Sequence, residues 1–240
     1  MKIFDIDGPV IQFLNKMADL MLINILTMVC CIPIITAGAA FTAMHYMALK
    51  IVRDEECYIT RGYFKSFREN FRQSTIIWLL LLLVAVILGM DFYIIEKSGI
   101  EFSKVFQTII TMFAVMAAFT AVMVFPIQAK FGNPIKNTLK NAFAVSILQF
   151  PKTFAMIILL FFPVALCMVT IKLFPVAFMF GFSLPAYLSA QLYNKTFLKM
   201  EKQFEEAHAP ESAEAEEAGE DERIFKDELD ESLVTDDKMQ

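Results

Sequence analysis

The stretch LMLINILTMVCCIPIITAGAAFTAMHYMAL, residues 20–49, decides the fold of this chain. It contains no Asp, Glu, Lys or Arg, and an apolar run of 18 or more residues is a candidate for crossing a bilayer. In hydrocarbon every backbone amide must be satisfied within its own segment, so the stretch must be helical. One continuous helix would be about 45 Å long, which exceeds a core of about 30 Å even at a tilt of about 40°. We therefore expect a break near Pro33, because proline removes a helix hydrogen bond.

Four more long apolar runs follow, at residues 73–92, 105–129, 153–171 and 173–194. The whole chain is 57% hydrophobic and 20% charged, with a mean hydropathy of +0.55. Soluble domains are typically about 45–50% apolar and about 25% charged. The sequence therefore predicts an all-α, polytopic transmembrane bundle with five spans, the first long and broken near Pro33, in a domain covering residues 1–200.

The long first run leaves two topologies open. A single broken crossing puts the N-terminus outside and the C-terminus in the cytoplasm, with 16 Lys and Arg on the cytoplasmic side and five opposite. A hairpin turning at Pro33–Gly38 puts both termini inside and divides these residues 18 to three. We favour the single crossing because the first arm of the hairpin, residues 20–35, would span only about 24 Å.

The predicted cytoplasmic loop at residues 50–72 carries a basic stripe beside an aromatic one. Side chains advance by about 100° per residue on a helix, which puts four basic residues on one side and four rings on an adjacent side. This pattern is typical of a helix in the headgroup plane, with its rings in the acyl boundary. A docking helix for a cytoplasmic partner is the alternative. This candidate lipid- or partner-contacting helix, called the basic segment below, comprises Arg61, Tyr63, Phe64, Lys65, Phe67, Arg68, Phe71 and Arg72.

A similar but fainter pattern follows Asn133–Pro134, a pair of residues typical of a helix start. The helix expected there carries Lys136 and Lys140 beside an apolar face and leads into the next span.

Charge divides the chain sharply near residue 200. Residues 201–240 have a net charge of −12, whereas the first 200 residues have +7. A tail rich in Glu, Asp and Ala cannot bury enough apolar surface to offset its chain entropy. We expect residues 201–240 to form an acidic, disordered cytoplasmic tail.

The apolar runs contain few groups that can carry chemistry. Ionisable residues within spans usually mark ion paths or substrate sites, and the weak intramembrane polar candidates here are Asn24, His45 and Asp91. No phosphate-binding loop, hydrolase motif or spacing of metal ligands is present. We expect no enzymatic activity, no cofactor or metal, and no nucleic-acid binding. Gly38–Thr42 and Ala39–Ala43 have the spacing of small residues that lets helices approach closely.

Residues 13–78 resemble the N-terminal half of the YesL-like bacterial membrane proteins, and the resemblance extends more weakly over about residues 1–200. The matching elements are Phe13-Leu14-Asn15, Ala18-Asp19, Cys31-Ile32-Pro33, Thr36-Ala37-Gly38-Ala39, Val52-Arg53-Asp54-Glu55-Glu56 and Phe64-Lys65-Ser66-Phe67.

The resemblance implies a multi-pass protein of the bacterial plasma membrane whose activity is uncharacterised. Members of that family are often encoded beside carbohydrate ABC-transport genes, which implies a role near sugar uptake. No catalytic residues are established for the family, so the resemblance assigns none here. We expect an auxiliary protein that contacts the lipid bilayer and an ABC transporter or other membrane partner. The alternative is a small-solute permease or channel in its own right.

Overall fold

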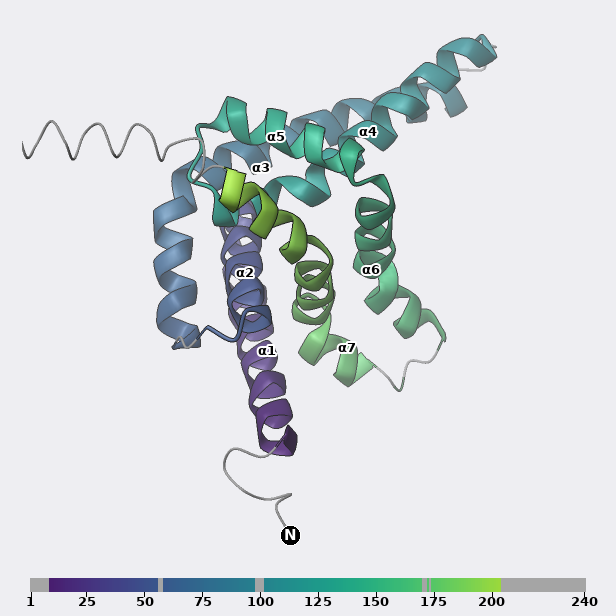
Figure 1. The fold of residues 1–240 in the computed structure, drawn as a ribbon. Coiled ribbons are helices and arrows are strands. Elements are labelled where there is room, and N and C mark those ends of the chain that lie inside the picture. The colour runs from purple at the N-terminus through teal and green to yellow at the C-terminus, as the bar shows by residue number, and fades with distance from the viewer. Residues whose placement is uncertain (1–8, 56–57, 98–101, 170–171, 173, 204–240) are drawn as a thin grey trace, which may run out of the picture. The chain divides into compact units, whose positions relative to one another are not determined.

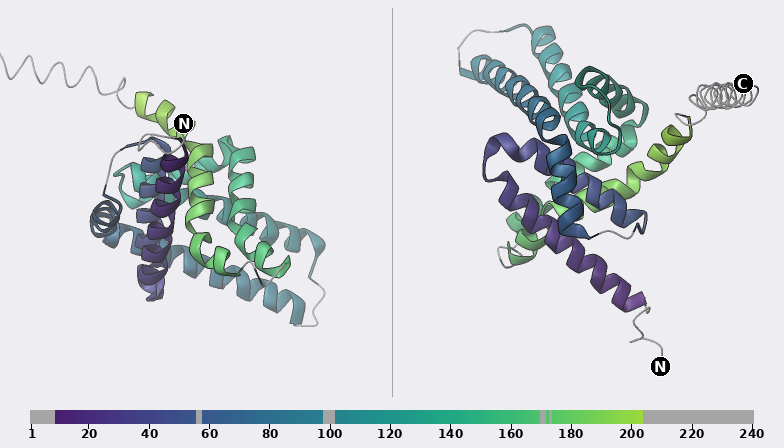
Figure 2. Two further views of the ribbon diagram at one scale, coloured as in Figure 1. Left: turned by 90° about the horizontal axis from the view of Figure 1, so that it is seen from below. Right: turned by 90° about the vertical axis from the view of Figure 1, so that its left-hand side faces the viewer.

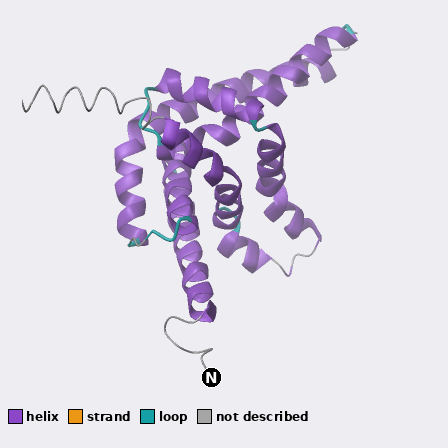
Figure 3. Ribbon diagram, in the orientation of Figure 1, coloured by secondary structure: helices purple, strands orange, loops and turns teal. Residues whose placement is uncertain are grey.

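The computed structural model describes residues 9–55, 58–97, 102–169, 172 and 174–203. Within these residues the regular structure is helical and contains no strand (Figure 3). The elements in chain order are α1 (Pro9–Cys31), the short 3₁₀ turn η1 (Ile34–Thr36), α2 (Ala37–Val52), α3 (Ile59–Lys97), α4 (Lys104–Lys130), α5 (Ile135–Leu148), α6 (Phe150–Val169) and α7 (Phe174–Phe180). Figure 1 labels the seven α-helices. A further helix, Ser183–Gln203, follows α7. The predicted all-α class is therefore confirmed.

The first apolar run breaks where the sequence predicts, but its two halves form a hairpin. The Nζ of Lys16, early in α1, lies 2.6 Å from a carboxylate oxygen of Asp54, just beyond the end of α2. The helices are therefore antiparallel, and the favoured reading of residues 20–49 as one broken crossing is wrong. The hairpin is possible because α1 begins at Pro9 and α2 continues to Val52, which makes both arms longer than the run without charges.

Four helices are long and apolar enough to cross a membrane: Val10–Cys31, Ile34–Val52, Ile59–Lys97 and Lys104–Lys130. Two bent helix pairs, one bent by 101° and one by 52°, raise the number to six if each pair forms a span. The predicted five spans lie within this range. The chain is thus a multi-pass membrane protein by the length and composition of its helices.

The contact between α2 and α3 is unusually close at Gly38. A Cβ atom at this position would lie 2.5 Å from both the backbone oxygen of Ser74 and the Cβ of Trp78. One turn later, the hydroxyl oxygens of Thr42 and Ser74 lie 2.9 Å apart. The close approach expected from the Gly38–Thr42 spacing is therefore confirmed, and it fixes α3 against the hairpin.

The later part of α3 runs beside α4, and together they extend away from α1 and α2 (Figures 1 and 2). Their side chains there are largely exposed, including Leu83, Met90, Val105 and Phe113. After α4 the chain turns into α5, and the direction then changes by 101° between α5 and the first part of α6.

The predicted span 173–194 is divided between α7 and Ser183–Gln203. By its internal contacts the chain forms two units, Met1–Asn194 and Lys195–Gln240. Residues 204–240, most of the predicted acidic tail, lie outside the described residues.

Candidate functional site

The basic segment is the first part of α3 and continues without interruption into the apolar part of that helix. Its inner face packs against the α1–α2 hairpin. Tyr63 is fully buried, and its hydroxyl lies 3.3 Å from the backbone oxygen of Ala40, to which it donates a hydrogen bond. Ser66, one turn on, is also buried. Tyr63 thus lies in the bundle, whereas a helix flat in the headgroup plane would place its ring in lipid.

The rings of the segment form a row of neighbouring aromatic side chains that leads from the buried Tyr63 to the surface. The ring centroids of Tyr63 and Phe67 are 6.5 Å apart, and those of Phe67 and Phe71 are 5.5 Å apart. Phe64 and Phe71 are 47% and 39% exposed. The outer rings are therefore free to contact lipid or a partner, as predicted for the whole stripe.

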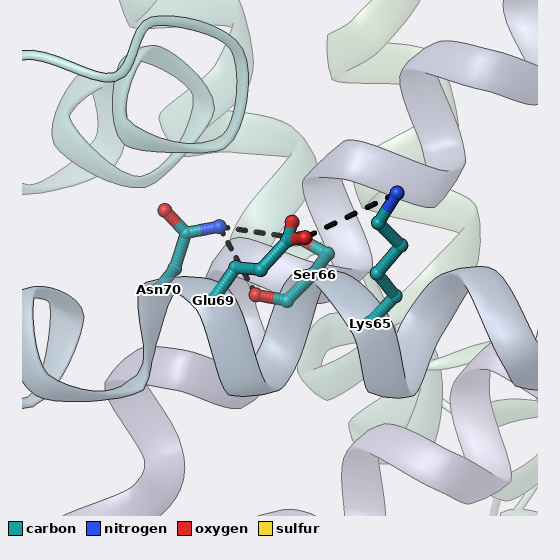
Figure 4. Close-up of polar contacts among 4 residues, drawn as sticks. All are labelled: Lys65, Ser66, Glu69 and Asn70. Carbon is teal, nitrogen blue, oxygen red and sulfur yellow. Dashed lines mark hydrogen bonds and ion pairs between the residues drawn. The ribbon is translucent and has the colours of Figure 1, made fainter.

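All four basic side chains of the segment, Arg61, Lys65, Arg68 and Arg72, belong to exposed residues. Lys65 makes an ion pair of 4.0 Å with Glu69 on the next turn (Figure 4). An exposed pair of this kind contributes only about 0.3–0.5 kcal/mol, so it does not prevent Lys65 from contacting another molecule.

A polar junction joins this part of α3 to the end of α4 and the start of α5. Asn70 donates to the backbone oxygen of Ser66 at 3.0 Å (Figure 4), and its side-chain oxygen accepts a bond of 3.3 Å from Gln128. The side-chain oxygen of Gln128 accepts a bond of 3.1 Å from Thr138, which is fully buried. Gln73 donates to the backbone oxygen of Asn133. These bonds hold α5 against α3.

The junction brings two predicted basic stretches together. A groove of about 850 Å³ lies between α3 and the α4–α5 turn, and both Arg72 and Lys136 line it. Lys140 is exposed one turn farther along α5. We call the exposed residues Lys65, Arg68, Arg72, Lys136 and Lys140 the basic surface.

Asn24 is fully buried at the break between α7 and Ser183–Gln203. Its amide nitrogen donates to the backbone oxygen of Phe178 at 2.8 Å. Its side-chain oxygen accepts from the backbone nitrogens of Phe182 at 2.9 Å and Ser183 at 3.2 Å. One side chain of α1 thus satisfies backbone groups on both sides of the break, which is a structural role.

His45 and Asp91 lie in different surroundings from Asn24. The Nδ1 of His45 is 3.4 Å from the hydroxyl of Tyr193, and His45 lines an internal cavity. Asp91 lies late in α3, in the part that extends beside α4. The structure therefore does not assemble the three polar candidates into one site.

The described residues contain no cluster of three His, Cys, Asp or Glu side chains that would hold a metal ion. Cys30 and Cys31 are free and half-buried at the end of α1. The sequence gives the basic residues of the site, but the bonds of Gln128 to Asn70 and Thr138 are not recognisable in it. An Asn, a Gln and a Thr far apart along a chain have no local signature.

Residues 20–92 match a protein family described as a protein of unknown function, DUF624, which includes the YesL-like proteins. No curated protein and no solved structure matches the chain.

Proposed function

We propose that this chain is a non-enzymatic auxiliary protein of the bacterial plasma membrane whose basic surface docks an acidic segment of a membrane partner. The observation that carries the proposal is the groove that joins Arg72 of α3 to Lys136 of α5. The resemblance to YesL-like proteins supports a partner that takes part in carbohydrate uptake, such as an ABC transporter.

The basic surface is suited to docking because hydrogen bonds to the rest of the bundle hold both helices that carry it in place. α3 is held to the hairpin by Tyr63 and Ser74, and α5 is held to α3 by Gln128 and Thr138. Charges on a rigid support lose less conformational entropy on binding than charges on a mobile loop. Several cations of one sign also increase the rate of encounter with an acidic partner.

The hairpin supports a cytoplasmic position for this surface and a revised position for the N-terminus. The pairing of Lys16 with Asp54 puts the start of α1 and the end of α2 on one side. With both helices crossing, Lys and Arg divide 18 to three, a stronger asymmetry than 16 to five. We therefore propose that both termini are cytoplasmic, in place of the N-terminus outside that the sequence alone favoured.

The test is affinity purification in mild detergent from the native membrane. The full chain is compared with a variant in which Arg68, Arg72, Lys136 and Lys140 are changed to Gln. The matched control changes Lys97 and Lys104 to Gln, because these exposed lysines lie at the far ends of α3 and α4.

We expect a specific partner that co-purifies with the native chain and the control, that is lost from the first variant, and that dissociates as salt rises. Equal recovery of that partner with both variants would refute the role of the basic surface.

A small-solute permease is the second candidate, and the interrupted helix α7–Ser183–Gln203 is the observation that favours it. Interrupted helices build the substrate sites of many transporters, although such sites leave backbone groups available to the substrate. Here Asn24 occupies three of these groups. Purified protein in sealed vesicles should therefore not accumulate radiolabelled sugars, and accumulation above that of empty vesicles would favour the permease.

A further inference from the structure

An internal cavity beside His45 is lined by residues that take no part in the proposed docking function. It has a volume of about 290 Å³ and lies among α2, α3, α4, α6 and the helix Ser183–Gln203. Met44, Met156 and Ala186 of its wall are 4%, 2% and 3% exposed. Leu160 and Phe182, which also line it, are 53% and 40% exposed. The entrance therefore lies between α6 and the start of Ser183–Gln203, on a face where α6 exposes apolar side chains.

One wall of the cavity is aromatic. The ring of Phe41 lies 5.9 Å from Trp78, 5.8 Å from Phe125 and 6.1 Å from Phe182, measured between centroids. The indole nitrogen of Trp78 donates to the backbone oxygen of Ile34 at 2.8 Å, which fixes the ring. Rings at these distances favour a flat, apolar guest that packs against their faces and edges.

The lining carries no charged residue, and its hydrogen-bonding side chains apart from Trp78 are those of His45 and Ser189. The Nδ1 of His45 faces the hydroxyl of Tyr193, which leaves the Nε2. Neither that atom nor the hydroxyl of Ser189 has a hydrogen-bond partner within the described part of the chain. Ser189 is only 5% exposed. Within the described residues, the fully buried side-chain atoms without a partner belong to Thr75 and Ser183. The Nε2 of His45 and the hydroxyl of Ser189 are instead accessible on the cavity wall, where a guest with one hydrogen-bonding group can bond to them.

We propose that this cavity binds a small, neutral, lipophilic ring compound with one hydrogen-bonding group, which enters from the bilayer. A cavity of about 150 Å³ lined by apolar side chains holds one benzene molecule, and ligand pockets begin near about 300 Å³. The volume therefore admits one or two fused rings. The end of a lipid acyl chain satisfies the size but offers no hydrogen bond to the Nε2 of His45 or the hydroxyl of Ser189.

Trp78 makes the proposal directly measurable, because it is the one tryptophan of the sequence and lines the cavity. Bromine quenches indole fluorescence on contact. The probes are 4-bromophenol and bromobenzene, which differ in one hydroxyl, added to the full chain in detergent. Ala121→Leu reduces the cavity, and Ala114→Leu is the matched control, since Ala114 lies two turns earlier on α4, is likewise half-buried and does not line the cavity.

We expect saturable quenching by 4-bromophenol that binds about fivefold more tightly than bromobenzene, the factor expected for one hydrogen bond of about 1 kcal/mol. Ser189→Ala should remove most of this preference, and Ala121→Leu, but not Ala114→Leu, should remove saturation. Quenching that rises linearly with probe in the native chain would overturn the proposal, because it indicates partition into detergent alone. Equal affinity of the native chain for both probes would also overturn it and would indicate a hydrocarbon guest such as a lipid chain. Neither of these results depends on the folding of a variant, and neither bears on the basic surface.

Discussion

Replacing Gly38 by Ala tests whether the crossing of α2 and α3 holds the bundle together. The new methyl group would meet the backbone oxygen of Ser74 and the Cβ of Trp78, each at 2.5 Å. Ordinary contacts between such atoms are about 3.5–4.0 Å, so the helices must separate by about 1 Å. Neither obstacle is the flexible end of a side chain, and rotation of a side chain cannot relieve the clash.

The expected loss of stability follows from three contributions. Overpacking of this kind destabilises by about 1–3 kcal/mol. Separation also stretches the hydrogen bond between Thr42 and Ser74, and interhelical bonds in membrane proteins contribute about 0.6 kcal/mol on average. The higher helix propensity of Ala opposes both by about 1 kcal/mol. We expect Gly38→Ala to lower the free energy of unfolding by about 0.6–2.6 kcal/mol.

The assay is equilibrium unfolding in mixed micelles with rising dodecyl sulfate, followed by the fluorescence of Trp78. Gly89→Ala is the matched control, because a Cβ at this position in α3 meets no atom within 4 Å. The control should be neutral or slightly stabilising. The close crossing is refuted if the two variants unfold at the same dodecyl sulfate fraction.

Three further predictions concern the hairpin and the two polar clusters. Asn24→Ala leaves three backbone groups at the helix break without partners, and it should lower the free energy of unfolding by about 1–3 kcal/mol in the same assay. The control Asn137→Ala changes an exposed residue and should alter it by no more than about 0.5 kcal/mol. An equally small change for Asn24→Ala would contradict its structural role. Gln128→Leu breaks the bonds to Asn70 and Thr138; amide hydrogens of α5 should exchange at least fivefold faster than in the native chain, and unchanged exchange would show that the junction does not hold α5. Single cysteines at positions 16 and 54 of a cysteine-free chain should react with an impermeant maleimide from the same side of sealed vesicles, and labelling from opposite sides would exclude the antiparallel hairpin.

Helix ends are predictable from the sequence where charged residues bound an apolar run. The expected span 105–129 agrees with α4, Lys104–Lys130, within one residue at each end. The expected span 73–92 is instead the middle of a helix of 39 residues. No Gly or Pro occurs between residues 63 and 88, so nothing in the backbone ends the helix that begins in the basic segment. Charge marks where a helix leaves hydrocarbon, but it does not end the helix.

For the candidate site, the sequence predicts which residues are exposed but not how they come together. The exposure of Arg68, Arg72 and Lys136 follows from their charge, and the sequence predicts each of them on a surface helix. The meeting of Arg72 and Lys136 at one groove depends on a hydrogen bond between Gln128 and Asn70, which are 58 residues apart. The hydroxyl of the buried Tyr63 likewise bonds to the backbone oxygen of Ala40, which lies on another helix. Helical periodicity defines faces on single helices, whereas the contacts that combine these faces depend on side chains distant in the sequence.

The turn of the α1–α2 hairpin has a consequence for how the chain enters the bilayer. Ile32, Ile34 and Ile35 are 78%, 68% and 58% exposed, and no charged group lies among residues 20–49. Several polar atoms of the turn form hydrogen bonds within the protein: the hydroxyl of Thr36 lies within bonding distance of the oxygens of Cys30 and Pro33, and the indole nitrogen of Trp78 donates to the oxygen of Ile34. With both termini in the cytoplasm, as proposed above, insertion of this hairpin would require no hydrophilic loop to be translocated. The two helices can then enter the membrane together as a paired unit, with the apolar turn between α1 and α2 entering first.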